Sequence, residues 1–197
     1  EGTRIELGRL QPGSALVSSL DGLAFFHQDA GITVVEDIYS GQYQVLRTDP
    51  HDPSRSRLVQ LGDRNLNRLD LLYDNDGRLQ YLVDTFGRTV VELLYDSVHA
   101  RRVGQVQRLF LREGNDFVVE RRETLATYTY TPTGQLNEVH EPGGQVLRRF
   151  SYTPEGLMAS HTLASGATFH YQWQRFAAVP RPTPNLPPLL EPQPDHE

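Results

Sequence analysis

The chain has 197 residues, a formal net charge of -6 and no cysteine. The acidic balance argues against a nucleic-acid-binding protein, which would gather basic residues on one surface. Without cysteine the chain has no disulfide framework, no thiolate zinc site and no thiol nucleophile. No apolar run reaches the ~18 residues that a membrane-spanning helix needs.

Residues 1–56 show the pattern of a β-rich region. Apolar runs at residues 32–35 and 43–46 predict strands, and the turn signals at residues 20–22 and 39–42 separate such runs. The dipeptides Asp49-Pro50 and Asp52-Pro53 predict an exposed loop over residues 48–57. The first residue is Glu1 rather than Met, and we therefore expect an internal piece of a longer polypeptide.

Residues 57–176 contain an internal repeat with a period of 22 residues. Tyr73, Gly77, Gly87 and Tyr95 are separated by 4, 10 and 8 residues, and the same spacings recur further along the chain. A fixed period of this length predicts one supersecondary unit that stacks against its neighbours. The repeat motif comprises Tyr73, Asp74, Gly77, Arg78, Asp84, Gly87, Arg88, Tyr95, Asp96, Tyr130, Gly134, Gly144, Tyr152, Gly156 and Gly166.

Each unit reads as a β-hairpin with tight turns at both ends. The turns at residues 74–77, 84–87, 131–134, 141–144 and 153–156 end in glycine, which predicts a type I turn followed by a glycine with positive φ. Asp or Thr at the first position can cap such a turn. Between the turns, residues of alternating character predict one apolar and aromatic face and one more polar face; they include Leu79, Tyr81 and Val83, then Val91, Leu93 and Tyr95, then Phe169, Tyr171 and Trp173.

The motif Tyr73-Asp74-x-x-Gly77-Arg78-Leu79, followed by Asp84-x-x-Gly87-Arg88 and Tyr95-Asp96, resembles the YD repeat of the Rhs family. Residues 63–69 resemble the half-repeat before such a unit, with Asn65 expected in the left-handed conformation. Thr replaces Asp after Tyr130 and Tyr152. The 35 residues from Tyr95 to Tyr130 contain either an insertion or a degenerate unit.

The resemblance implies an all-β fold in which repeated hairpins form part of a spiralling sheet or hollow shell, as in bacterial Rhs toxins, toxin-complex B and C components and teneurins. In bacteria such a shell encloses a C-terminal toxin domain until delivery, commonly through a type VI secretion apparatus. The implied partners are the remaining shell segments, the toxin and a spike protein of that apparatus. The implied location is the bacterial cytoplasm before export, followed by secretion or delivery to a target cell.

No residue is nominated as catalytic, and no cofactor or metal ligand is expected. Asp-Pro-x-Gly, the self-cleavage motif of Rhs-like proteins, does not occur at Asp49-Pro50 or Asp52-Pro53. Asp74-Asn75-Asp76-Gly77 departs from the calcium-loop pattern, because Leu72 and Val83 stand where carboxylates are needed. The seven histidines show no metal-ligand spacing.

Two features leave alternatives open. The aromatic stripe favours a packed face, but a surface adhesin or carbohydrate-binding module would also need such side chains. Residues 177–197 are rich in proline, which predicts an extended linker or tail.

Overall fold

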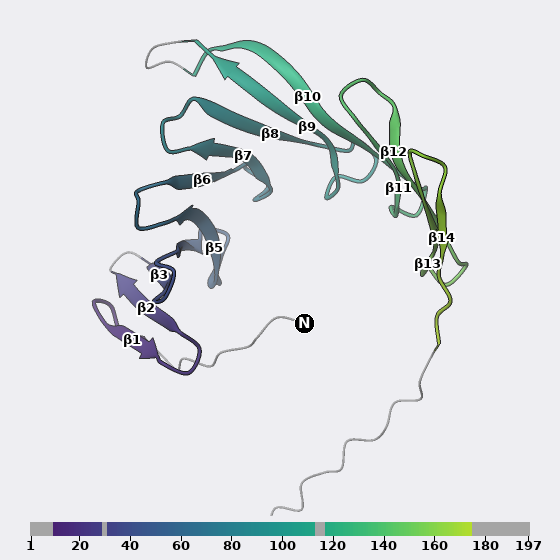
Figure 1. The fold of residues 1–197 in the computed structure, drawn as a ribbon. Helices are drawn as coiled ribbons and strands as arrows, with labels where there is room; N and C mark the ends of the chain where they lie inside the picture. Colours follow the sequence, from purple (N-terminus) through teal and green to yellow (C-terminus); the bar gives the residue numbers. More distant parts are fainter. Residues whose placement is uncertain (1–9, 29–30, 113–116, 175–197) are drawn as a thin grey trace, which may run out of the picture.

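The computed structural model describes residues 10–28, 31–112 and 117–174. Within these ranges the chain forms fourteen β-strands and no helix, which confirms the all-β prediction. The strands make one antiparallel sheet in sequence order, so each strand pairs with its neighbours along the chain. The sheet is an open arc with β1 and β14 at opposite ends (Figure 1). No helix in the described ranges is long and apolar enough to cross a membrane.

The strands have 3 to 7 residues, except β5, β9 and β10, which have 11, 9 and 12. They are β1 (Ala15–Ser18), β2 (Leu23–Gln28), β3 (Ile32–Asp37), β4 (Tyr43–Asp49), β5 (Asp52–Gly62), β6 (Arg68–Tyr73), β7 (Leu79–Asp84), β8 (Thr89–Tyr95), β9 (Val103–Leu111), β10 (Val119–Tyr130), β11 (Leu136–His140), β12 (Val146–Tyr152), β13 (Met158–Leu163) and β14 (Thr168–His170). Residues on both sides of position 57 belong to this one sheet, and the proline-rich tail lies outside the described residues.

The strands expected at residues 32–35 and 43–46 lie within β3 and β4, but the loop expected at residues 48–57 is wrong. Only Pro50 and His51 separate β4 from β5. Pro50 is accommodated in the turn itself, and Pro53 is accommodated because the pairing is irregular between Thr48 and Asp49, where β5 carries extra residues that need no ladder hydrogen bond.

The interval between Tyr95 and Tyr130 is one long hairpin. It contains β9 and β10, of 9 and 12 residues, which pair with each other along most of their length. The interval is therefore an enlarged unit of the same up-and-down sheet rather than a different kind of structure.

The expected division into an apolar and a polar face holds only in part. Near the C-terminal end, Phe150 pairs with His161 and His161 with Phe169 on one face, while Arg149, Thr162 and Thr168 form a polar row on the other. In the centre the prediction is wrong. Tyr81 and Val83 lie on the face opposite Val91, Leu93 and Tyr95, because Tyr81 pairs with Glu92 and Val83 with Val90.

Two features of the pairing place these residues: the pairing of Val83 with Val90 across the next turn puts Val91 on the other face, and a β-bulge in β7 puts Leu79 and Tyr81 on opposite faces. Tyr73 pairs with Leu79, but Leu72 pairs with Tyr81, so Gln80 is an extra residue. An extra residue moves the following side chains to the other face. Both faces of the central strands consequently carry apolar side chains.

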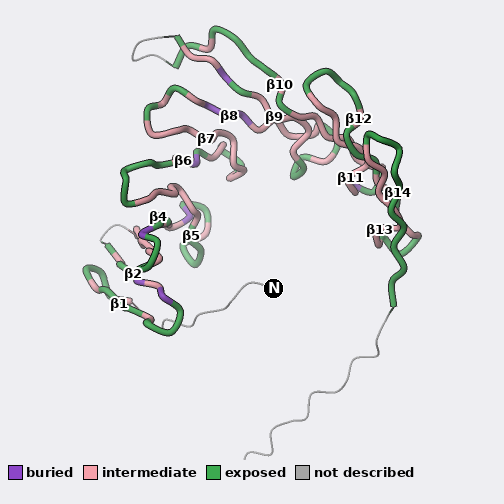
Figure 2. Tube along the Cα trace, in the orientation of Figure 1, coloured by how far each residue is buried: buried purple, intermediate pink, exposed green. Residues whose placement is uncertain are grey.

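The sheet has no second layer within the described ranges, and its buried core is small. The buried apolar residues are Ala24, Phe25, Leu71, Val90 and Leu109. Figure 2 places the buried strand residues mainly in the first two thirds of the arc, whereas β12 to β14 are intermediate or exposed. Large apolar residues stay exposed, including Phe169 at 49% and Trp173 at 56%. One sheet layer cannot cover both of its own faces.

Candidate functional site

The repeat tyrosines lie together at one rim of the sheet, here called the tyrosine rim. Tyr73, Tyr95, Tyr130 and Tyr152 are the last residues of β6, β8, β10 and β12. The turns that follow these strands all lie at this rim, and the turns after β5, β7, β9, β11 and β13 form the opposite rim. The 22-residue period of the sequence thus corresponds to two strands, after which the chain returns to the same rim of the sheet.

All four tyrosines make the same contact. Each hydroxyl donates a hydrogen bond to a backbone carbonyl of the preceding strand: Tyr73 to Leu58 (2.6 Å), Tyr95 to Leu79 (2.8 Å), Tyr130 to Val103 (2.6 Å) and Tyr152 to Leu136 (2.7 Å). Trp173 takes the next place in this series, because its indole nitrogen donates to the carbonyl of Met158 at 2.6 Å. The side chains fasten each hairpin to the one before it.

Burial raises the pKa of each of these tyrosine hydroxyls above its ordinary value. Partial removal from water disfavours the phenolate, and the neutral hydroxyl is the form that donates a hydrogen bond. The fastening bonds are therefore retained at neutral pH.

The turns have the geometry that their sequences predict. Gly77, Gly87, Gly134, Gly144 and Gly156 have φ between 67° and 84°, and Gly166 has 86°. The first turn residue caps the turn in the Asp and Thr versions alike: the Asp74 carboxylate accepts from the amide of Arg78 at 2.8 Å, and the Thr131 hydroxyl accepts from the amide of Gln135 at 3.1 Å. This equivalence explains why Thr can replace Asp in the repeat.

The expectation for Asn65 is wrong, because Leu66 is the residue with positive φ, at 66°. Asp63 sets the turn: its carboxylate accepts from the amides of Asn65 and Asn67, and its carbonyl accepts from the amide of Leu66. The residue with positive φ is thus the third after the capping Asp63. A count of eight residues back from Tyr73 gives Asn65, which is one residue too early.

Arg78 connects two turns of the tyrosine rim. Its guanidinium donates to the Asp74 carboxylate at 2.8 Å and to the carbonyl of Ala100, in the next turn of that rim, at 2.9 Å. It also lies 4.6 Å from the centre of the Tyr95 ring. Burial raises the pKa of Asp74, but hydrogen bonds from the amide and side chain of Arg78 outweigh it and hold that pKa below its ordinary value. The carboxylate therefore stays ionised and paired.

Other side chains continue these connections along the tyrosine rim. Gln135 donates to the carbonyl of Gly156 at 3.0 Å, and His99 lies 3.4 Å from the carbonyl of Pro132. Gln135 could have been found from the sequence, because it directly follows a turn glycine as Arg78 does. His99 is three residues after the repeat residue Asp96, where the turn after Tyr73 has Gly77, but nothing in the sequence signals its contact with Pro132.

At the opposite rim, Arg88 directly follows Gly87 but makes no side-chain hydrogen bond or ion pair within the described ranges. Gly87, Gly144 and Gly166 have no neighbouring atom within 4 Å of the point where a Cβ would stand, whereas Gly77 and Gly134 lie against Arg57 and His99. The repeat residues therefore have different environments at the two rims.

No metal site is formed in the part of the chain that the structure describes. The Asp74 carboxylate is committed to Asp76 and Arg78. Among the histidines, His27 contacts Thr33, His140 contacts Glu138, and His161 stacks on Phe169 with ring centres 4.7 Å apart. His51 and His170 join no group of ligands there, and His196 lies outside the described ranges.

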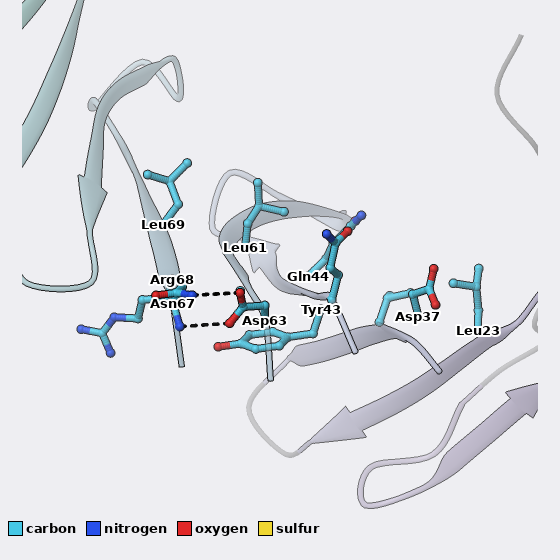
Figure 3. A pocket seen from close by; sticks show the side chains of 12 residues that line it. Leu23, Asp37, Tyr43, Gln44, Leu61, Asp63, Asn67, Arg68 and Leu69 are labelled. Atoms are coloured by element: carbon cyan, nitrogen blue, oxygen red, sulfur yellow. Dashed lines mark hydrogen bonds between the residues drawn. The ribbon is translucent and has the colours of Figure 1, made fainter. Parts of the chain in front are cut away.

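Several hollows lie along the sheet, with volumes of about 450 to 720 Å³. One, of about 550 Å³, spans β2 to β6 and is lined by Leu23, Asp37, Tyr43, Leu61 and Asp63 among others (Figure 3). Asp63 is held there by a hydrogen bond from the Asn67 amide group at 3.0 Å. The ring of Tyr43 lies where a side chain on Gly62 would stand, so this glycine is required by close approach rather than by φ.

A second hollow, here called the rim groove, also has a volume of about 550 Å³ and lies on the tyrosine rim between β8 and β12. Its lining includes the aliphatic residues Leu93, Val103, Val106 and Leu136, together with Tyr128, Tyr130 and Tyr152. Arg102 and Gln135 add polar groups.

No protein-family model matches the chain, and no curated protein matches it in sequence. The geometry itself provides a series of identical fastenings between hairpins, an aromatic groove and a single uncovered sheet. These features can bind and enclose. Among the described residues they do not assemble a nucleophile, a general base and an oxyanion site.

Proposed function

We propose that the chain is a structural segment of the shell of an Rhs-type secreted toxin or effector, which encapsulates a C-terminal toxin domain before delivery. In this proposal the chain is not an enzyme. Its partners are the remaining segments of the shell, the enclosed toxin and a spike protein of the secretion apparatus. It is present in the bacterial cytoplasm before export and is then secreted or delivered.

The observation that carries this proposal is the repeated hydroxyl-to-carbonyl bond of the tyrosine rim. A bond that recurs from hairpin to hairpin lets a sheet grow by addition of further identical units without a change of geometry. The strictly sequential strand order and the single layer also suit a wall. A wall needs little core of its own, because it can be covered by what it encloses.

The free sides of the terminal strands support the same role. β14 pairs only with β13 in the described sheet, and its other side presents unpaired backbone groups that favour another strand. Flanking segments of the same polypeptide are the natural partners in a shell.

The test is size-exclusion chromatography with multi-angle light scattering, on the chain alone and on the chain co-expressed with the segments that flank it in its gene. We expect self-association alone and a defined complex with the flanking segments. A stable monomer that ignores those segments would contradict the proposal.

An adhesin or carbohydrate-binding module is the second candidate, favoured by the partly exposed aromatic series at β14. Tyr171 is 39% and Trp173 is 56% exposed, and flat aromatic rings of this kind can stack on sugars. Oligosaccharide binding that disappears in Tyr171→Ala and Trp173→Ala would favour it. Unchanged chromatographic behaviour in those variants, without any sugar binding, would favour the shell.

A further inference from the structure

The rim groove has the chemistry of a surface that binds proline-rich chain. Three tyrosines and four aliphatic residues line it, and aromatic-lined grooves bind polyproline helices because the rings pack against the pyrrolidine rings. Two of the tyrosines, Tyr130 and Tyr152, are already fixed by their hydroxyl bonds. Fixed rings lose little entropy on binding, which is an advantage for a groove with a flexible ligand.

The polar groups of the groove also suit a proline-rich ligand. The Tyr128 hydroxyl and the Arg102 guanidinium have no acceptor among the described residues, and both can donate. A proline has a carbonyl but no amide hydrogen, so a proline-rich chain offers acceptors and few donors. Arg102 is also exposed, and it can pair with a carboxylate at the end of such a ligand.

The chain contains a segment with these properties. Residues 180–194 hold seven prolines, with Leu186, Leu189 and Leu190 between them and Glu191 directly after the leucines. The leucines can fill the aliphatic part of the groove, and Glu191 complements the charge of Arg102. We propose that residues 180–194 of the same chain occupy the rim groove. The proposal does not depend on the shell function.

The connection to the groove is long enough. Trp173 is bonded to Met158 at the start of β13, so the last described residues leave the sheet at the tyrosine rim. Arg102, at the far end of the groove, directly precedes β9. The distance from β13 to β9 is four strand spacings, or about 19 Å. The eighteen residues from Gln174 to Glu191 span up to about 50 Å in polyproline form. The segment therefore reaches Tyr152 first, with its earlier prolines, and Arg102 last, with Glu191.

The test uses engineered disulfides in the full chain, which has no native cysteine to interfere. Pro188→Cys is combined with Thr133→Cys, in the turn beside the groove, or with Gly143→Cys. Position 188 is three residues, or about 9 Å in polyproline form, before Glu191, so it lies beside the β10–β11 turn when Glu191 is at Arg102. Thr133 and Gly143 are both exposed third residues of Pro-containing turns, but Gly143 is at the opposite rim. A cysteine at position 143 meets only ordinary contacts, and Gly143 does not have positive φ.

We expect the intramolecular disulfide at position 133 to form at least about tenfold faster than at position 143, because docking raises the local concentration of the segment at the groove. Glu191→Arg should remove most of this preference, and the charge-swapped pair with Arg102→Glu should restore it. Arg101→Glu, the same charge change at the neighbouring exposed residue, should leave the preference intact.

Two outcomes would overturn the proposal. Equal rates at positions 133 and 143 would mean that the segment does not dock. Fast disulfide formation at position 133 that gives dimers on a non-reducing gel would mean that the segment of a second copy occupies the groove. Tyr128→Phe, which removes only the hydroxyl, provides a second variant that should slow the reaction at position 133 without affecting the fold.

Discussion

At the scale of single residues, the repeat positions have separable physical roles. Asp74 caps a turn, Gly77 supplies the left-handed backbone, Arg78 reaches the next turn, and Tyr95 bonds to the strand before it. Each role depends on one atom or one dihedral angle. Single conservative substitutions can therefore test them individually.

Tyr95→Phe and Tyr152→Phe should each lower the free energy of unfolding by about 1 kcal/mol, because each removes one partly buried hydroxyl-to-carbonyl hydrogen bond and keeps the ring. Urea denaturation measures the change. Tyr39→Phe is the matched control, since Tyr39 is 75% exposed and its hydroxyl has no partner among the described residues. An equal loss in the control would mean that the rim bonds do not carry the effect.

Gly144→Ala should lower the free energy of unfolding by about 1 kcal/mol, whereas Gly143→Ala should be close to neutral. Gly144 has φ 82° and open space around it, so the cost of an alanine there is backbone strain alone. Gly143 does not have positive φ, so an alanine there is not strained. Gly134→Ala should cost more than Gly144→Ala, because the new Cβ would lie 3.0 Å from the His99 ring. Thermal denaturation of the three variants gives the order. A Gly143 variant as unstable as the Gly144 variant would contradict the assignment of the turn.

At the scale of elements, each of the four hairpins whose first strand ends in a repeat tyrosine carries a bulge at the second residue of its second strand. The extra residues are Gln80, Gly104, Asn137 and Ala159, and each lies beside the pairing of a repeat tyrosine. A bulge increases local twist and bends its strand. Regular bulges at one rim give a physical reason for the curved sheet in Figure 1.

The same bulges explain what could be predicted from the sequence. The turns were predictable because glycine, Asp and Thr act locally within four residues. The faces were not, because an extra residue such as Gln80 reverses the alternation without any compositional mark. The contacts of Arg78 with Ala100 and of Arg102 with the groove also require knowledge of which turns share a rim.

Arg78→Lys should increase local opening of the β8/β9 connection by about five- to tenfold, because an ammonium cannot reproduce the directed hydrogen bonds of the guanidinium to Asp74 and Ala100. Hydrogen exchange of the backbone amides of residues 96–102 measures this opening. Arg88 follows the equivalent glycine at the opposite rim, and Arg88→Lys should change the exchange rates by less than about twofold. If both variants behaved alike, the connection between turns would not contribute to stability.

At the scale of the whole molecule, the backbone contacts of the described strands join only adjacent strands. Side chains reach one strand further, as in the pairing of Arg122 in β10 with Glu92 in β8 and in the bond from Arg78 to Ala100, but the described strands bring no distant parts of the sheet together. Such a sheet resembles a linear array in its energetics, in which each hairpin is stabilised by the units on both sides. The terminal strands have one neighbour each, so they gain most from an added strand.

The final prediction concerns the free side of β14. The amide of Tyr171 donates to Ala159, and the pairs alternate, so the amides of Thr168 and His170 point away from β13. His170→Pro should therefore keep the β13–β14 pairing and reduce association, because proline removes only an outward donor and obstructs an incoming strand. Phe169→Pro is the matched control, since its amide faces β13 and its loss should lower the melting temperature. Light scattering and thermal denaturation of both variants separate the two effects. Association of the His170→Pro variant at the wild-type level would show that β14 is not the surface through which the chain assembles.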